Sequence, residues 1–129
     1  MTEHPNAAAA RRSYEAWNSG DLDVIREYFT DDAVLHLAGN NAMSGTYRGR
    51  DAVMDAIARA SQGWGLHSEL EALLASDDHV IAFVRVTSER DGKTLDVVVA
   101  QAVKVNAEGK ATEAWFLPND QGGYDRFFL

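Results

Sequence analysis

The sequence contains no cysteine and only two prolines in 129 residues. Without cysteine it can form no disulfide framework, no thiolate nucleophile and no cysteine-based metal site. No apolar run approaches the roughly 18 residues that a membrane span needs. Basic residues are also few, because 12 Lys and Arg stand against 20 Asp and Glu and give a formal net charge of −8. With no basic stripe to neutralise phosphates or anionic headgroups, we expect neither nucleic acid nor a membrane as a partner.

The length and composition are those of one domain covering residues 1–129. A chain of this size, 46% hydrophobic, can bury a core without covalent staples. Its start, Met1 to Asn6, lacks the basic-then-apolar order of a secretory signal, so we expect a cytoplasmic protein. The partner classes that remain are a small molecule, another protein and a second copy of the chain.

Helical spacing of apolar residues dominates the first half of the chain. It predicts helices over 7–18, 21–30 and 51–61, a short strand over 33–37 and a long loop over 39–49. The period then changes from 3.6 to 2 and predicts strands over 66–74, 79–89, 94–105 and 111–117, with turns at 90–93 and 106–109. Three helices followed by a strand meander indicate an α+β fold, with the helices on one face of a curved antiparallel sheet.

The segment 94–105 is apolar on both faces of its predicted strand. Val97, Val99 and Val103 share one face, and Val98 and Ala100 lie on the other. A sheet with one face in water should alternate between apolar and polar residues. Because the helices can cover only one face, we predict a homodimer through the back of the sheet.

Four stretches carry a resemblance to a known family. They are Tyr14 to Asp21, Phe29 to Val34, Tyr47 to Val53 and Gly109 to Asp120, in this order over nearly the whole chain. In these stretches the chain resembles the SnoaL-like branch of the nuclear-transport-factor-2-like superfamily, which includes ketosteroid isomerases, limonene epoxide hydrolase and polyketide cyclases. The resemblance implies a cone built around one apolar pocket, and it says little about function because the motifs encode turns, caps and core.

The catalytic residues of two activities found in this superfamily are missing from this chain. The resemblance places the isomerase base at Leu37, its oxyanion-hole tyrosine near Ser13 and its protonated aspartate near Gln101. Leu37 cannot abstract a proton, so we expect no steroid isomerase activity. The epoxide hydrolase needs an Asp-Arg-Asp relay, but Arg85 lacks the acid and Leu117 occupies the place of the second aspartate. That activity is not expected either.

The polyketide cyclase chemistry demands less of the protein, and it leaves two candidate catalytic residues. An intramolecular aldol closure needs a dry, shaped pocket and one acid or base of suitable pKa. His36 on the first strand and Asp120 after the last strand are the candidates. In a regular strand His36 points away from the Leu37 face, so a structural histidine is the alternative. For Asp120, which precedes Gln121 and two glycines, the alternative is a capping or turn residue.

Gln101 is the most informative candidate for ligand binding. It interrupts the apolar row of Val97, Val99 and Val103, where a buried amide must find a hydrogen-bond partner. Trp64 lies between two glycines and is predicted to act as a mobile lid. The other predicted wall residues are Trp17, Leu35, Leu37, Met43, Tyr47, Val84, Val86, Val99 and Phe116.

The sequence leaves three functional hypotheses open. The first is an acid–base enzyme of the cyclase or isomerase type, acting without a cofactor on an apolar, carbonyl-bearing metabolite. The second is a non-catalytic module that binds such a ligand, and the third is a protein-interaction module. A metal site is not expected, because His67, Glu69 and Glu71 alternate as the solvent face of an edge strand would.

Overall fold

The structure, a computed structural model, describes residues 3–129; residues 1 and 2, which begin the segment inspected for a secretory signal, lie outside the described residues. The fold is α+β, in agreement with the sequence prediction. The elements in chain order are α1 (Pro5–Ser19), α2 (Leu22–Tyr28), β1 (Phe29–Leu37), β2 (Gly45–Arg48), α3 (Arg50–Ala58), a π-helical turn (Arg59–Gly63), β3 (His67–Ala75), β4 (His79–Arg90), β5 (Lys93–Val105), β6 (Ala111–Pro118) and α4 (Gln121–Phe127).

The strands form one curved, open sheet in the order β2-β1-β6-β5-β4-β3. The sheet is mixed, since β1 runs parallel to β6 while the other neighbours are antiparallel. The predicted antiparallel pairing holds except between β1 and β6, because β6 takes its direction from its hairpin with β5 and β1 joins it from a distant part of the chain. β2 lies inside the segment predicted as a loop, and its four residues are too few for an alternating pattern.

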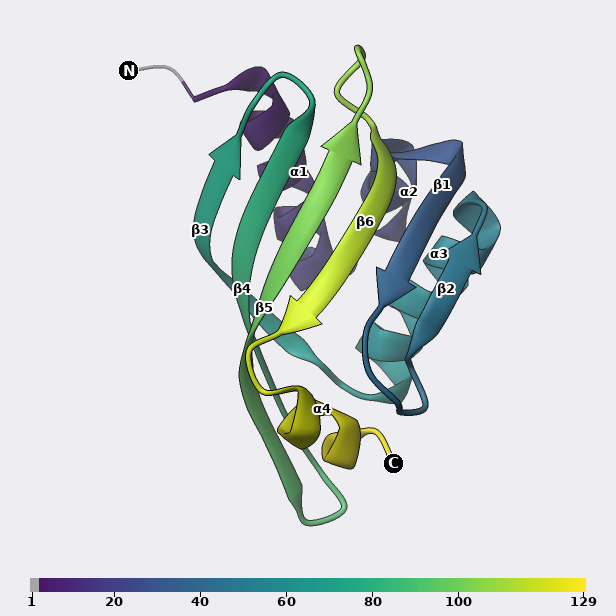
Figure 1. The fold of residues 1–129 in the computed structure, drawn as a ribbon, viewed down its shortest axis with the longest axis vertical. Helices are drawn as coiled ribbons and strands as arrows, with labels where there is room; N and C mark the ends of the chain where they lie inside the picture. The colour runs from purple at the N-terminus through teal and green to yellow at the C-terminus, as the bar shows by residue number, and fades with distance from the viewer. Residues whose placement is uncertain (1–2) are drawn as a thin grey trace.

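Helices α1, α2 and α3 cover one face of the sheet, behind it in Figure 1. Asp21 caps α2 by accepting from the Val24 amide, and Gly20 ends α1 in the left-handed conformation at φ 77°. A fourth helix, α4, which the sequence did not predict, lies at one end of the sheet beside the long β4–β5 hairpin (Figure 1). None of the helices in the described part of the chain is long and apolar enough to cross a membrane.

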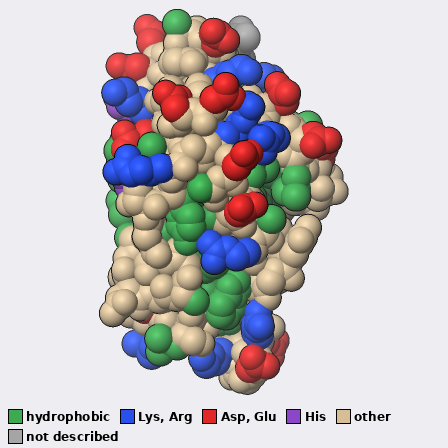
Figure 2. All heavy atoms as spheres, turned by 90° about the vertical axis from the view of Figure 1, so that its right-hand side faces the viewer, with side chains coloured by type: hydrophobic (Ala, Val, Ile, Leu, Met, Phe, Trp, Pro, Cys, Tyr) green, Lys and Arg blue, Asp and Glu red, His purple; other side chains and the backbone are tan. Residues whose placement is uncertain are grey.

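The two faces of the sheet differ in environment, and β4 shows this most clearly. Val80, Ala82 and Val84 are buried under the helices, whereas Ile81 and Phe83 are 41% and 38% exposed on the outer face. The predicted alternation along this strand therefore matches the structure. At the side of β2 and α3, acidic and basic side chains intermix over the upper half of the surface, without a basic stripe on this face (Figure 2).

Candidate functional site: an apolar cavity beneath the sheet

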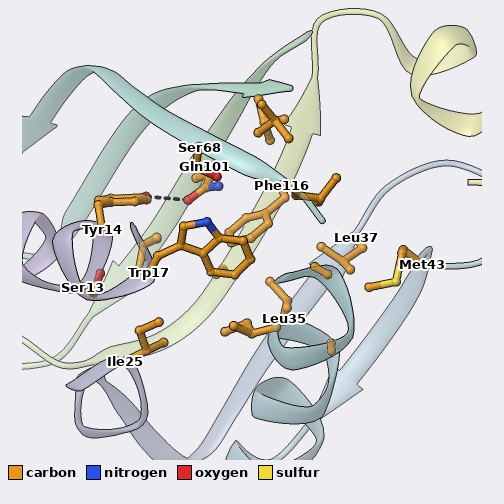
Figure 3. Close-up of a pocket in the computed structure, with 18 of the residues that line it drawn as sticks. Ser13, Tyr14, Trp17, Ile25, Leu35, Leu37, Met43, Ser68, Gln101 and Phe116 are labelled. Atoms are coloured by element: carbon orange, nitrogen blue, oxygen red, sulfur yellow. Dashed lines mark hydrogen bonds between the residues drawn. The ribbon is translucent and has the colours of Figure 1, made fainter. Parts of the chain in front are cut away.

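A cavity of about 120 Å³ lies between α1–α3 and the inner face of the sheet. Its walls are mostly aliphatic and aromatic, and the side chains converge on it from both layers (Figure 3). The lining residues are Ser13, Tyr14, Trp17, Ile25, Tyr28, Phe29, Leu35, Leu37, Met43, Ala56, Ile57, Ala60, Leu66, Ser68, Val86, Val99, Gln101, Val103, Ala114, Phe116, Tyr124 and Phe128. Among residues 3–129, no carboxylate, imidazole or basic side chain lines it.

Three lining residues form a row across adjacent strands. Leu37 of β1 pairs with Phe116 of β6, and Phe116 pairs with Gln101 of β5. Leu37 and Gln101 are thus two strands apart, roughly 10 Å between their backbones. Gln101, the only amide side chain among the described residues that line the cavity, therefore lies at one end of this row, and the aliphatic Leu37 lies at the other.

Gln101 is held by a tyrosine from the helical layer. The Tyr14 hydroxyl donates to Gln101 Oε1 at 2.5 Å, and the amide nitrogen lies on the side away from Tyr14 (Figure 3). Burial, and to a smaller degree the neighbouring Tyr28, raises the pKa of the Tyr14 phenol well above its ordinary range, so the hydroxyl stays protonated and remains a donor. No residue among 3–129 accepts a hydrogen bond from Gln101 Nε2, which leaves this donor available to a ligand.

A second tyrosine that lines the cavity is Tyr28, at the end of α2. Its oxygen is buried and has no hydrogen-bond partner within residues 3–129. Burial raises the pKa of Tyr28 to about 12, so this group is also neutral at physiological pH. The two serines are less available, since the Ser13 hydroxyl donates to Ala10 O within its own helix.

Most of the predicted wall residues line the cavity. Trp17, Leu35, Leu37, Met43, Val86, Val99, Gln101 and Phe116 all do so. Three others do not. Val84 is fully buried in the core beside the cavity, and Tyr47 borders a separate surface hollow, where its hydroxyl donates to Met43 O.

Trp64 is not the free lid that its flanking glycines suggested. Its ring packs edge-on against Phe128 with centroids 4.9 Å apart. The Arg90 guanidinium lies over the ring at 4.5 Å and donates to Gly63 O. These contacts hold the partly buried indole between Arg90 of β4 and the aromatic side chains at the end of α4.

Neither candidate catalytic residue reaches the cavity. His36 points to the outer face of the sheet, where its Nε2 lies 2.6 Å from Glu113 Oε2 and its ring stacks on Trp115. The reason is that β1 is regular here: Leu35 and Leu37 face the cavity, so His36 between them faces the other side of the sheet. Asp120 caps α4 by accepting from the Gly123 amide, which is the capping alternative considered above.

Sequence reasoning missed Tyr14, Tyr28 and the contribution of α4. The isomerase resemblance pointed near Ser13, and both Ser13 and Tyr14 line the cavity, but it is the Tyr14 hydroxyl that reaches Gln101. Tyr28 follows Ile25 on the same face of α2, and this spacing was a usable signal. Tyr124 of the unpredicted α4 and Phe128, which directly follows this helix, line one end of the cavity.

Comparison with known proteins agrees with this geometry. The model of the SnoaL-like domain matches residues 10–114. The chain belongs to the SnoaL-like family. The Mycobacterium tuberculosis protein Rv0034, itself uncharacterised, is 32% identical over 115 residues, 87% of each chain. Among solved structures, this SnoaL-like chain is similar to Bal32a from a soil-derived mobile gene cassette, with a TM-score of 0.91 and 32% identity over 96% of each chain.

A more distant structure carries a ligand. RV0760c from Mycobacterium tuberculosis in complex with estradiol-17β-hemisuccinate has a TM-score of 0.76 and 21% identity, covering 88% of this chain and 93% of that one. At this identity the likeness establishes a shared fold.

Proposed function

We propose that this SnoaL-like protein binds a neutral, largely apolar small molecule that carries a carbonyl group, and that Gln101 Nε2 donates to the carbonyl oxygen. The observation that carries the proposal is the unpaired amide donor, fixed by Tyr14, in a wall that is otherwise apolar. The chain offers this nitrogen no acceptor, and a ligand carbonyl in the cavity supplies one, in the way that a few placed polar groups orient ligands in apolar sites. The steroid ester seen in RV0760c supports small-molecule binding by this fold.

The residues that line the cavity favour ligand binding over catalysis by proton abstraction. An acid–base enzyme needs a group that can take a proton near neutral pH. The tyrosine hydroxyls in the wall have raised pKa values, and His36 and Asp120 lie elsewhere. A cyclase that relies only on holding its substrate folded is the second candidate, supported by the apolar lining of the same cavity.

The test compares two probes of one shape, cyclohexanone and methylenecyclohexane, titrated by NMR. We expect the ketone to bind more tightly, and Gln101→Leu to weaken ketone binding about five- to tenfold without changing the binding of the alkene. His36→Ala, on the other face of the sheet, is the control and leaves both affinities unchanged. Equal binding of the two probes to the unmodified protein contradicts carbonyl recognition.

We also propose that a second copy of the chain covers the outer face of the sheet. Leu117 is 51% exposed there beside Ile81 and Phe83, and Val98 and Ala100 lie between them. Some polar groups of this face pair within the chain: Arg85 forms an ion pair with Asp96, and His36 lies 2.6 Å from Glu113. The exposed apolar side chains between them form a patch that can meet its own copy about a two-fold axis. Light scattering at micromolar concentration tests this, and a monomer contradicts it.

A further inference from the structure

The Tyr28 hydroxyl has no function in the fold as described. Phenylalanine at this position would keep the ring contact with Phe29, whose centroid lies 5.7 Å away. The oxygen gains no hydrogen bond from any residue among 3–129, although it is buried in the cavity wall. Buried hydroxyls are normally paired, so an orphaned one beside a cavity indicates a partner that enters the cavity.

The position of Tyr28 makes it a donor distinct from Gln101. Tyr28 comes from α2 in the helical layer, whereas Gln101 comes from β5 in the sheet. Tyr14 already satisfies the amide oxygen of Gln101, so Gln101 Nε2 and the hydroxyl of Tyr28, two residues that line the cavity from different layers, are left without a partner among residues 3–129. One ligand oxygen on each side would satisfy both.

The volume of the cavity limits the size of the ligand that carries the two oxygen atoms. Its volume is about 120 Å³. An apolar protein cavity of about 150 Å³ holds one benzene, whereas sites for drug-sized ligands run from roughly 300 Å³ upward. A cavity of the benzene-holding size fits a single six-membered ring, whereas a four-ring steroid is too large for it.

We propose that the ligand is a neutral, single-ring compound with two oxygen functions, a carbonyl that accepts from Gln101 Nε2 and a second oxygen paired with the Tyr28 hydroxyl. This inference rests on the proposed function, because it assigns the second polar contact and the size class of the ligand of the same cavity. It makes Tyr28 a residue that selects between singly and doubly oxygenated rings.

The experiment titrates cyclohexanone, 3-hydroxycyclohexanone and 4-hydroxycyclohexanone into the unmodified protein and into Tyr28→Phe. The two hydroxyketones place the second oxygen at different distances from the carbonyl. We expect at least one of them to bind about fivefold more tightly than cyclohexanone, and Tyr28→Phe to remove that gain, so that the hydroxyketone and cyclohexanone bind to the variant with similar affinity. Estradiol, the size control, is expected not to bind.

The outcomes separate the two proposals. If cyclohexanone binds but neither hydroxyketone gains affinity, or if the gain survives in Tyr28→Phe, the second contact is wrong and the carbonyl site stands. Binding of estradiol in the cavity overturns the size class. If cyclohexanone binds no better than methylenecyclohexane, the proposed function itself fails. Thermal unfolding of Tyr28→Phe guards against a folding defect; we expect it at least as stable as the parent, because it loses only an unpaired hydroxyl.

Discussion

Leu37 stands where the resemblance to ketosteroid isomerases places the catalytic base, and the structure puts its side chain in the cavity wall. It shares a row with Phe116 and with Gln101, whose amide donor faces the same space. A carboxylate at this position would have an apolar surrounding, which raises the pKa of a carboxyl group and strengthens it as a base. What the cavity lacks for abstracting a proton from a bound ketone is therefore a basic side chain, and position 37 is where the resemblance places it.

Replacing Leu37 with aspartate tests this view. We expect Leu37→Asp to accelerate hydrogen–deuterium exchange at the α-carbon of cyclohexanone, measured by mass spectrometry. We also expect it to cost on the order of 2 kcal/mol of unfolding free energy, since a polar group replaces aliphatic packing. Leu37→Asn, of nearly the same shape but without a base, is the matched control. Equal exchange in the two variants would show that a base at this position does no chemistry.

Which residues face the cavity was predictable where alternation was regular. The period-2 pattern of β4 and β5 assigned Val86, Val99 and Gln101 to the inner face, and the structure agrees. The pattern could not separate a cavity wall from solid core, so Val84 was included although it does not line this cavity. That distinction depends on how the helices dock, which no single strand encodes.

At the scale of elements, α4 and the segment 38–44 close one end of the cavity together. Asp125 of α4 accepts from the Asn40 amide, from Asn41 Nδ2 at 2.7 Å and from Gln121 Nε2, and the Ala42 amide donates to Phe128 O. Gly39 allows the close approach: its φ is 95°, and a Cβ there would collide with Gln121 and Asp125. This set of contacts, which we call the α4 latch, holds Tyr124 and Phe128 over the cavity.

The α4 latch is expected to weaken in acid. The hydrogen bond from Asn41, followed by those from Gln121 and Asn40, lowers the pKa of Asp125 below its ordinary value. A carboxyl group with a lowered pKa stabilises the folded arrangement above its unfolded pKa, about 3.9, and loses that contribution as the pH falls through the folded value. We therefore expect NMR signals of α4 and residues 38–44 to broaden below about pH 4, while the signals of β5 stay sharp.

Two variants separate the charge of Asp125 from its hydrogen bonding. Asp125→Asn keeps an acceptor oxygen but does not titrate, so the pH dependence of the α4 signals should vanish. Asp125→Ala removes the acceptor and should loosen α4 at every pH, with faster release of bound cyclohexanone. Unchanged release in Asp125→Ala would mean that the ligand enters elsewhere.

The two elements that the sequence did not predict have a common physical cause. β2 and α4 are short, and both depend on tertiary contacts more than on local propensity. In α4 the Gln121-Gly122-Gly123 start is typical of a turn, and the helix forms because Asp120 caps it and Phe127 and Phe128 are buried. The longer elements have regular spacing and were predicted to within a few residues at their ends.

At the scale of the whole molecule, the sheet separates two surfaces with different tasks. Its inner face, with Gln101, lines the cavity, and its outer face, with Ile81, Phe83 and Leu117, is exposed and apolar. Adjacent residues on β4 point to opposite faces, so a substitution on one face leaves the side chains of the other in place. Ligand binding and self-association are therefore expected to respond to separate sets of residues.

Phe83→Lys tests that separation. Each copy in a dimer through the outer face would bury one added ammonium group, and burying an unpaired charge strongly disfavours association. We expect analytical ultracentrifugation to find a dimer for the unmodified chain and a monomer for Phe83→Lys, with the same affinity for cyclohexanone. Val24→Lys is the matched control: Val24 is also 38% exposed, but it lies on α2 in the helical layer, so this variant should remain a dimer. A Phe83→Lys variant that stays dimeric would place the contact between copies on another surface, and one that loses ketone binding would mean that the two faces are coupled through the sheet.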